Sequence, residues 1–124
     1  MEKVILIVED EEKNLKLFRD LLQVSGYTTL EATDGKQGVE LAREKKPDLI
    51  LMDIQMPVMD GFEATKLLKN DDVTKDIPIV ALTAYAMQGD EEKMREAGFD
   101  GYISKPIDVP DFLKKVKEYF HNVR

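Results

Sequence analysis

Several polar residues of this sequence directly follow short apolar runs, and their side chains could share one chemical site. The acids among them are Glu9, Asp10 and Asp53. Carboxylates that lie close together repel one another, and a protein tolerates them only where a cation neutralises them. Hard oxygen ligands favour Mg²⁺ among the common cations. We therefore expect a magnesium ion beside these three acids.

Thr83 and Lys105 follow two further apolar runs and add a hydroxyl and an ammonium group. A metal ion, an ammonium and a hydroxyl around one carboxylate suit the oxygens of a phosphoryl group, whose transfer depends mainly on positioning and charge neutralisation. Asp53 would be the nucleophile, because a carboxylate can carry an aspartyl-phosphate. Each of these residues alone is more typical of a turn or a helix cap. Their conjunction behind successive runs favours phosphoryl chemistry.

The elements that must position these residues alternate along the chain. Short runs rich in β-branched residues predict strands, and apolar residues at helical spacing predict helices. The predicted strands are Lys3–Val8, Tyr27–Ala32, Leu49–Met52, Ile79–Leu82 and Tyr102–Ile103. The predicted helices are Asn14–Val24, a segment around Val39–Ala42, Phe62–Leu68, Asp90–Ala97 and Pro110–Phe120. Such alternation predicts an α/β fold with a parallel sheet covered on both faces.

The composition of each predicted strand indicates its place in the sheet. The first, third and fourth are continuously apolar, as central parallel strands are. The second carries Thr28, Thr29 and Glu31, and the fifth is short, so both fit edges. We therefore predict a doubly wound, flavodoxin-like (βα)5 sheet of order 2-1-3-4-5. In this architecture ligands bind beyond the carboxyl ends of the strands, where the strand order reverses.

Length and composition limit the functional classes. A chain of 124 residues fits one domain, residues 1–124, and its 43% apolar and 35% charged residues are typical of a soluble globular protein. The lack of cysteine excludes a disulfide scaffold, a thiolate zinc site and a cysteine nucleophile. The net charge of -7 repels nucleic acid. The apolar run near the N-terminus is too short for a signal peptide or a membrane span, so we expect a cytoplasmic protein without a nucleic-acid or membrane partner.

Five motifs in order resemble the receiver domain of two-component response regulators over nearly the whole chain. They are Ile7-Val8-Glu9-Asp10-Glu11, Leu51-Met52-Asp53-Ile54-Gln55-Met56-Pro57, Met59-Asp60-Gly61, Leu82-Thr83-Ala84 and Ser104-Lys105-Pro106. Within that family the chain is most similar to stand-alone receivers of the DivK and CheY kind. Those of the DivK kind act in cell-division and polarity signalling.

The resemblance implies a role for each acid of the site. Asp53 matches the phosphoacceptor and Asp10 the direct metal ligand, while Gln55 would lend its backbone carbonyl to the Mg²⁺ ion. Glu9 matches the second member of the acidic pair, where many receivers have aspartate. Because glutamate is longer by one methylene, we expect Glu9 to reach the metal through a water molecule.

The resemblance also implies roles for the residues of the last two strands. Thr83 matches the switch hydroxyl, Lys105 the phosphate-binding lysine and Tyr102 the switch aromatic. The Lys105–Pro106 peptide bond is expected to be cis, a geometry that X-Pro bonds make accessible. On phosphorylation, Thr83 would move toward the phosphate and Tyr102 would turn inward.

The function implied is that of a single-domain response regulator. A histidine kinase or phosphotransfer protein would pass a phosphoryl group to Asp53 in a Mg²⁺-dependent reaction. The signal would leave through protein contacts on the face of the fourth helix, fifth strand and fifth helix. We expect the chain not to be an enzyme but a switch that catalyses its own phosphorylation and dephosphorylation.

Three other functional classes compete with this one. A hydrolase of the haloacid-dehalogenase type also uses an aspartyl nucleophile, but that family carries a second acid where this chain has Gln55, and a cap domain is lacking. A flavin or nucleotide binder shares the fold, yet neither G-x-G-x-x-G nor G-x-x-x-x-G-K-[ST] occurs in the sequence. A purely structural module would not explain the polar residues behind four of the five predicted strands.

Overall fold

The structure, a computed structural model, describes residues 3–84 and 88–121. Its strands are β1 (Val4–Val8), β2 (Thr28–Ala32), β3 (Leu49–Asp53), β4 (Ile79–Thr83) and β5 (Gly101–Ser104). Its helices are α1 (Glu12–Val24), α2 (Gly35–Lys45), α3 (Gly61–Lys69), α4 (Gln88–Ala97) and α5 (Val109–His121). None of the helices in these described ranges is long and apolar enough to cross a membrane.

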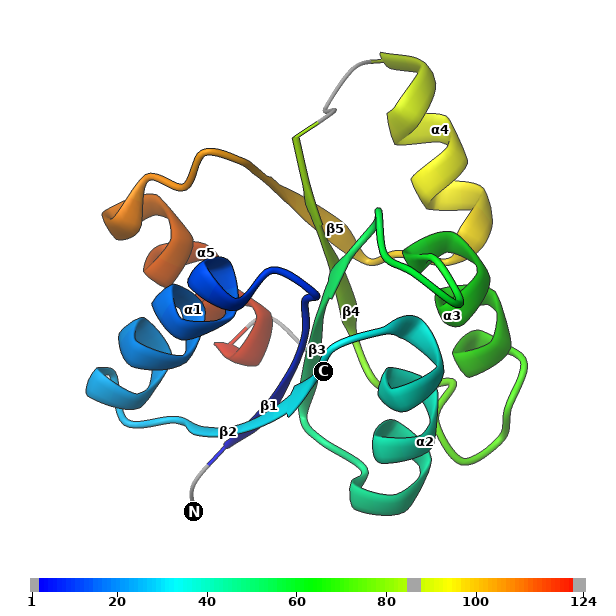
Figure 1. Ribbon diagram of the computed structural model, residues 1–124, viewed down its shortest axis with the longest axis horizontal. Coiled ribbons are helices and arrows are strands. Elements are labelled where there is room, and N and C mark those ends of the chain that lie inside the picture. The colour runs from blue at the N-terminus through cyan, green and yellow to red at the C-terminus, as the bar shows by residue number, and fades with distance from the viewer. Residues whose placement is uncertain (1–2, 85–87, 122–124) are drawn as a thin grey trace.

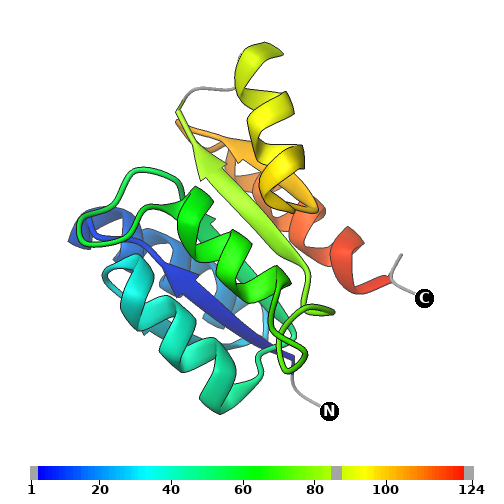
Figure 2. The ribbon, with the colours of Figure 1, turned by 90° about the vertical axis from the view of Figure 1, so that its right-hand side faces the viewer.

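The strands form one parallel sheet in the order β2-β1-β3-β4-β5, which confirms the predicted topology. Helices α1 and α5 cover one face of this sheet, and α2, α3 and α4 cover the other (Figure 1). Figure 2 shows the second layer from its outer side, with the three helices lying over the strands. The sheet is therefore buried on both faces, as its apolar strands require.

Two hydrophobic clusters lie on opposite faces of the sheet, because successive side chains of a strand point to opposite faces. Ile5 and Ile7 of β1 belong to the cluster under α1 and α5. Leu6 and Val8 belong to the cluster under α2, α3 and α4. Phe18 of α1 stacks on Phe112 of α5, with ring centroids 5.5 Å apart, and joins these two helices over their face.

Most element boundaries differ from the predicted ones by at most two residues, whereas α2 extends beyond the predicted segment around Val39–Ala42 at both ends. Strands β3 and β4 each extend one residue further than the apolar run, so Asp53 and Thr83 are the last residues of their strands. Parallel pairing with the neighbouring strand holds the backbone extended there whatever the side chain is. Asp34 is the N-cap of α2, and its side chain accepts a hydrogen bond from the Gln37 amide at 2.8 Å.

Candidate functional site

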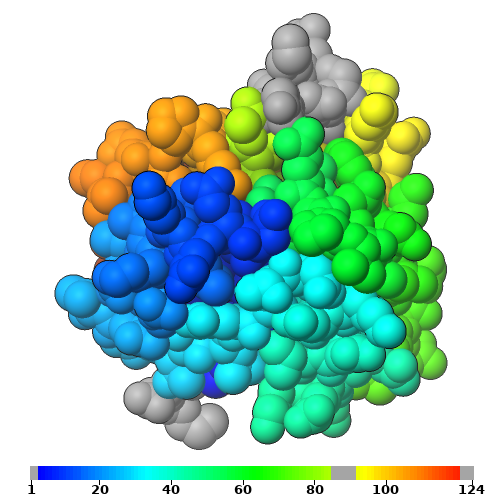
Figure 3. Space-filling view, in the orientation of Figure 1, coloured from blue at the N-terminus to red at the C-terminus, as the bar shows by residue number. Residues whose placement is uncertain are grey.

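A polar crevice of about 270 Å³ lies at the carboxyl ends of β1, β3, β4 and β5. Six of the predicted site residues line it: Glu9, Asp10, Asp53, Gln55, Thr83 and Lys105. Figure 3 shows the segments that build it, since the blue start of the chain, the green segment after β3 and the orange segment after β5 meet on this face of the molecule. The structure thus brings the predicted residues together at the edge where parallel strands end.

The strand pleat aims three of these side chains to the same side. Backbone ladder bonds continue one residue beyond β1 and β5, from the Glu9 amide to the Ala32 carbonyl at 3.0 Å and from the Lys105 amide to the Thr83 carbonyl at 2.8 Å. Alternation then places Glu9, Asp53 and Lys105 on the face that α1 and α5 cover. The Lys105–Pro106 peptide bond is cis, as predicted.

The acids of the crevice form a set of hard oxygen donors. One carboxylate oxygen each from Glu9, Asp10 and Asp53 lies within 4.8 Å of the others. Glu9 and Asp53 are buried, with 1% and 7% of their surface exposed, whereas Asp10 is exposed. The donor set fits Mg²⁺, which prefers a few carboxylates and keeps several waters.

The surroundings of Glu9 raise the pKa of its carboxyl group. Burial, followed by the charge of Asp53 and a hydrogen bond with it, raises the pKa of Glu9 from 4.5 to about 7. The hydrogen bonds from Lys105 and from the Glu11 amide act in the opposite direction and are outweighed. Burial and the charge of Asp53 thus both disfavour an ionised Glu9, and a bound divalent cation would offset the second of these two effects.

The loop after β3 holds the Asp53 carboxylate in place. Oδ1 of Asp53 accepts a long hydrogen bond, 3.4 Å, from the Gln55 amide. Gly61 begins α3 so close to β3 that a Cβ atom there would collide with the Asp53 carbonyl oxygen. The Asp60 side chain caps that helix by accepting from the Glu63 amide at 2.9 Å. Only glycine allows this approach, and it brings the N-terminus of α3 beside the site.

Thr83 and Tyr102 lie on the opposite face of the sheet from Asp53. Thr83 is 2% exposed and lines the crevice, whereas Tyr102 lies outside it and is half-buried. Strand pairing sets Thr83 beside Ser104 and Tyr102 beside Ala81. Because Ala81 and Thr83 share a face, Tyr102 lies one pleat below Thr83 on that face.

Further residues of the crevice were not predicted from the sequence. Glu11, Asn14 and Ala84 also line it. Asn14 stands in the first turn of α1, and its place four residues after Asp10, at the start of the helix that follows the acidic pair, is the signal that could have found it. The principal partner of Lys105 was also missed: its Nζ donates to Glu9 Oε1 at 3.0 Å and lies 3.5 Å from Asp53 Oδ2.

Comparison with known proteins gives concordant matches. The response regulator receiver domain family matches residues 5–117. The polar-differentiation response regulators DivK of Brucella anthropi and Brucella ovis are 55% and 54% identical over 119 residues, which cover 96% of this chain and 97% of each relative.

Solved structures agree with these matches. The receiver domain of a Pseudomonas aeruginosa sensor histidine kinase, which holds a magnesium ion in its active-site cleft, superposes with a TM-score of 0.90 at 34% identity, covering 98% of this chain and 99% of that one. The Vibrio cholerae chemotaxis protein CheY4 superposes with a TM-score of 0.91 at 28% identity, covering 96% and 99%.

The expectation that the chain is no enzyme but a switch that catalyses its own phosphorylation and dephosphorylation is wrong as stated. The matched family and the DivK relatives describe a signalling protein, and they do not support self-catalysed turnover. The physical reason is that the geometry of the crevice describes only how its groups could hold a phosphoryl group. Holding a group does not accelerate its transfer unless the transition state is bound more tightly than the ground state.

Proposed function

The chain belongs to the response regulator receiver domain family, and we propose that it accepts a phosphoryl group on Asp53 from a histidine kinase or a phosphotransfer protein. The observation that carries the proposal is the position of the Asp53 carboxylate. It ends β3 inside the crevice, beside Glu9 and Asp10 and 3.5 Å from the Lys105 ammonium. Such a carboxylate is a nucleophile with a cationic group ready to receive the oxygens of the incoming phosphoryl group.

A Mg²⁺ ion would be held by Asp10, Asp53 and the Gln55 backbone carbonyl, and Glu9 would reach it through a water molecule. When bound, the ion supplies positive charge that offsets the acids and the phosphoryl oxygens. Lys105 supplies a second positive charge from the other side of Asp53. Thr83 contributes a buried hydroxyl at the end of the adjacent strand, where it can donate to a phosphoryl oxygen.

Intact-mass analysis or Phos-tag electrophoresis after incubation with a phosphorylated histidine kinase or phosphotransfer protein tests this function. We expect one added phosphoryl group with Mg²⁺ and none with EDTA. Asp53→Asn should abolish the labelling, because the nucleophilic carboxylate is gone. Asp72→Asn is the matched control, since the Asp72 side chain is 97% exposed and lies outside the crevice. Undiminished labelling of the Asp53→Asn protein would contradict the proposal.

Readout of phosphorylation is proposed to pass from Thr83 to Tyr102. A phosphoryl group adds about two negative charges and strong acceptor oxygens, and these attract the Thr83 hydroxyl. Tyr102, one pleat below on the same face, can fill the space that the threonine leaves. A bias of about 1 kcal/mol, one hydrogen bond's worth, shifts such a rotamer equilibrium substantially.

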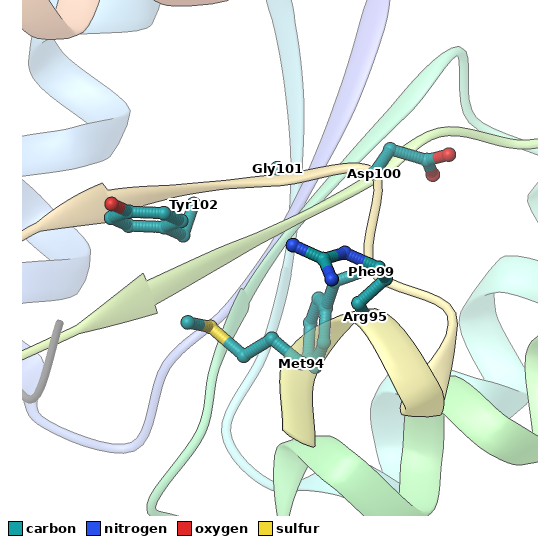
Figure 4. A pocket seen from close by; sticks show the side chains of 6 residues that line it. All are labelled: Met94, Arg95, Phe99, Asp100, Gly101 and Tyr102. Atoms are coloured by element: carbon teal, nitrogen blue, oxygen red, sulfur yellow. The ribbon is translucent and has the colours of Figure 1, made fainter. Parts of the chain in front are cut away.

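The surface that would change is the face formed by α4, β5 and α5. A cavity of about 220 Å³ between α4 and β5 is lined by Met94, Arg95, Phe99, Asp100, Gly101 and Tyr102. Figure 4 shows the Tyr102 ring beside β5 and the Met94 and Arg95 side chains reaching toward the strand from α4. A turn of Tyr102 would alter one wall of this cavity. We propose that a downstream protein reads the altered face.

NMR of the Tyr102 ring with and without beryllofluoride, a phosphoryl mimic, tests the readout. We expect its resonances to move on addition of the mimic, and Thr83→Ala to reduce that movement while Asp53 still accepts phosphate. Unchanged Tyr102 resonances would locate the switch elsewhere. The cytoplasmic location and the assignment of residues 1–124 to a single receiver domain stay predictions.

A further inference from the structure

Lys105 has two acidic neighbours at unequal distances. Its Nζ donates to Glu9 Oε1 at 3.0 Å, which is an ordinary length for such a bond. The same Nζ is 3.5 Å from Asp53 Oδ2, at the limit of hydrogen bonding. The principal partner of the lysine is therefore Glu9 and not the proposed phosphoacceptor.

Both carboxylate oxygens of Glu9 accept hydrogen bonds from other groups of the chain. Oε1 accepts from Lys105, and Oε2 accepts from the Glu11 amide at 3.1 Å. The residue is 1% exposed, so these two donors replace the water that a surface carboxylate would have. Together they set the orientation of the Glu9 carboxylate and, through it, the position of the lysine.

The pair spans a long distance within the sheet. Strands β1 and β5 are separated by β3 and β4, so their backbones lie roughly 14 Å apart at about 4.8 Å per strand spacing. Lys105 and Glu9 bridge this gap because both have long side chains and both point to the α1 and α5 side of the sheet. Aspartate at position 9 would be shorter by one carbon–carbon bond, about 1.5 Å.

We propose that Glu9 is a positioning residue for Lys105. It holds the ammonium group over the crevice and keeps it from closing on the Asp53 carboxylate, which stays open to a metal ion and a phosphodonor. The inference rests on the proposed function, because it assigns Asp53 oxygens to Mg²⁺ binding. Without the reach of Glu9, the nearest acid for Lys105 is Asp53, and the lysine then competes with the metal for the same oxygens.

A double-mutant cycle on Mg²⁺ affinity tests this role by isothermal titration calorimetry. The cycle compares the unsubstituted protein, Glu9→Asp, Lys105→Ala and the double variant. Glu9→Asp keeps the negative charge and shortens only the reach. Lys105→Ala should raise the Mg²⁺ affinity in both backgrounds. We expect the fold-increase to be at least about five times larger in the Glu9→Asp protein than in the unsubstituted protein. Lys16→Ala, which removes an exposed lysine outside the crevice, is the control and should give no such difference.

Equal factors in the two backgrounds would overturn the positioning role and leave the proposed function intact. Failure of the unsubstituted protein to bind Mg²⁺ would overturn the proposed function and this inference together. If circular dichroism shows that Glu9→Asp does not fold, Glu9→Gln takes its place in the cycle. It keeps the length and shape of the side chain, and its neutral amide holds an ammonium more weakly than a carboxylate does, so the same direction is expected.

Discussion

Two buried threonines beside α3 differ in how their hydroxyls are satisfied. Thr65, within the helix, is fully buried, and in the described part of the chain its Oγ1 is the one buried side-chain nitrogen or oxygen without a hydrogen-bond partner. Thr74, in the loop that follows, is equally buried, and its Oγ1 donates to the Leu68 carbonyl at 2.7 Å. A buried polar group without a partner costs stability, whereas one with a partner contributes to it.

Thr65→Val should therefore raise the free energy of unfolding, by about 1 kcal/mol. The substitution replaces an unsatisfied hydroxyl with a methyl group of nearly the same size. Thr74→Val is the matched control and should lower the free energy of unfolding by about 1 kcal/mol, because it removes a made hydrogen bond. Urea denaturation measures both. Equal losses in the two variants would show that the Thr65 hydroxyl has a partner in solution.

The environment of Tyr119 in α5 predicts that the free energy of unfolding depends on pH. Burial first, and then the charges of Asp100 and Glu118, raise the pKa of its hydroxyl above the usual 10. An acid whose pKa is raised by folding stabilises the fold while it is protonated in both states. That stability is present below pH 10 and is lost as the pH rises through the higher folded-state pKa.

The free energy of unfolding should accordingly fall between pH 9 and pH 11, within about one unit of that usual value. Tyr119→Phe should fall less steeply over the same interval, because it has no hydroxyl to ionise. Urea denaturation at successive pH values measures the two slopes. Identical slopes would show that Tyr119 does not contribute.

At the scale of elements, β5 and α5 pack through the contact of a tyrosine with a glycine. The Tyr119 hydroxyl lies over Gly101, in the space that a Cβ atom of that residue would occupy. This contact sets how closely α5 approaches the edge strand that carries Tyr102 and leads to Lys105. A side chain at position 101 would push the helix or the tyrosine away.

Gly101→Ala should destabilise the protein by about 1–3 kcal/mol, the usual cost of overpacking. Tyr119→Phe removes the clashing oxygen, so Gly101→Ala should cost less in that background. Thermal unfolding of the four proteins in this cycle measures the difference. The same cost in both backgrounds would mean that the backbone of β5 and not the tyrosine absorbs the strain.

At the scale of the whole molecule, the crevice sets a balance between stability and charge. The chain carries a net charge of -7, and three acids converge on one rim with Lys105 as the cation that contacts two of them. Repulsion among these acids opposes the folded state. A ligand that binds only the folded state shifts the balance back by mass action.

Mg²⁺ at 100 times its dissociation constant should raise the free energy of unfolding by about 2.7 kcal/mol. Asp10→Ala should abolish this gain and slightly raise the stability in EDTA, because one of the repelling charges is removed. Thermal unfolding with Mg²⁺ and with EDTA measures both effects. Asp72→Ala, with the same change of charge at an exposed position, should retain the Mg²⁺ gain. A full Mg²⁺ gain in the Asp10→Ala protein would show that Asp10 is not a ligand.

The sequence by itself determined the α/β fold and the order of the strands. Central parallel strands are buried on both faces and therefore read as unbroken apolar runs such as Leu49–Met52, while the edge strand Thr28–Ala32 carries polar residues. Six residues of the crevice were also predictable, because the carboxyl ends of parallel strands meet at one edge of the sheet. The order of the motifs and the resemblance to receiver domains then assigned roles to Asp53, Thr83 and Lys105.

The tertiary structure alone decided which side chains became partners. Lys105 and Glu9 are 96 residues apart in sequence and belong to strands that are not neighbours, so their hydrogen bond depends on reach across the assembled sheet. The contact of Tyr119 with Gly101 and the missing partner of Thr65 likewise depend on how helices pack on strands. Periodicity in a sequence records the face on which a residue lies, whereas partner choice depends on distances of a few tenths of an ångström that only packing sets.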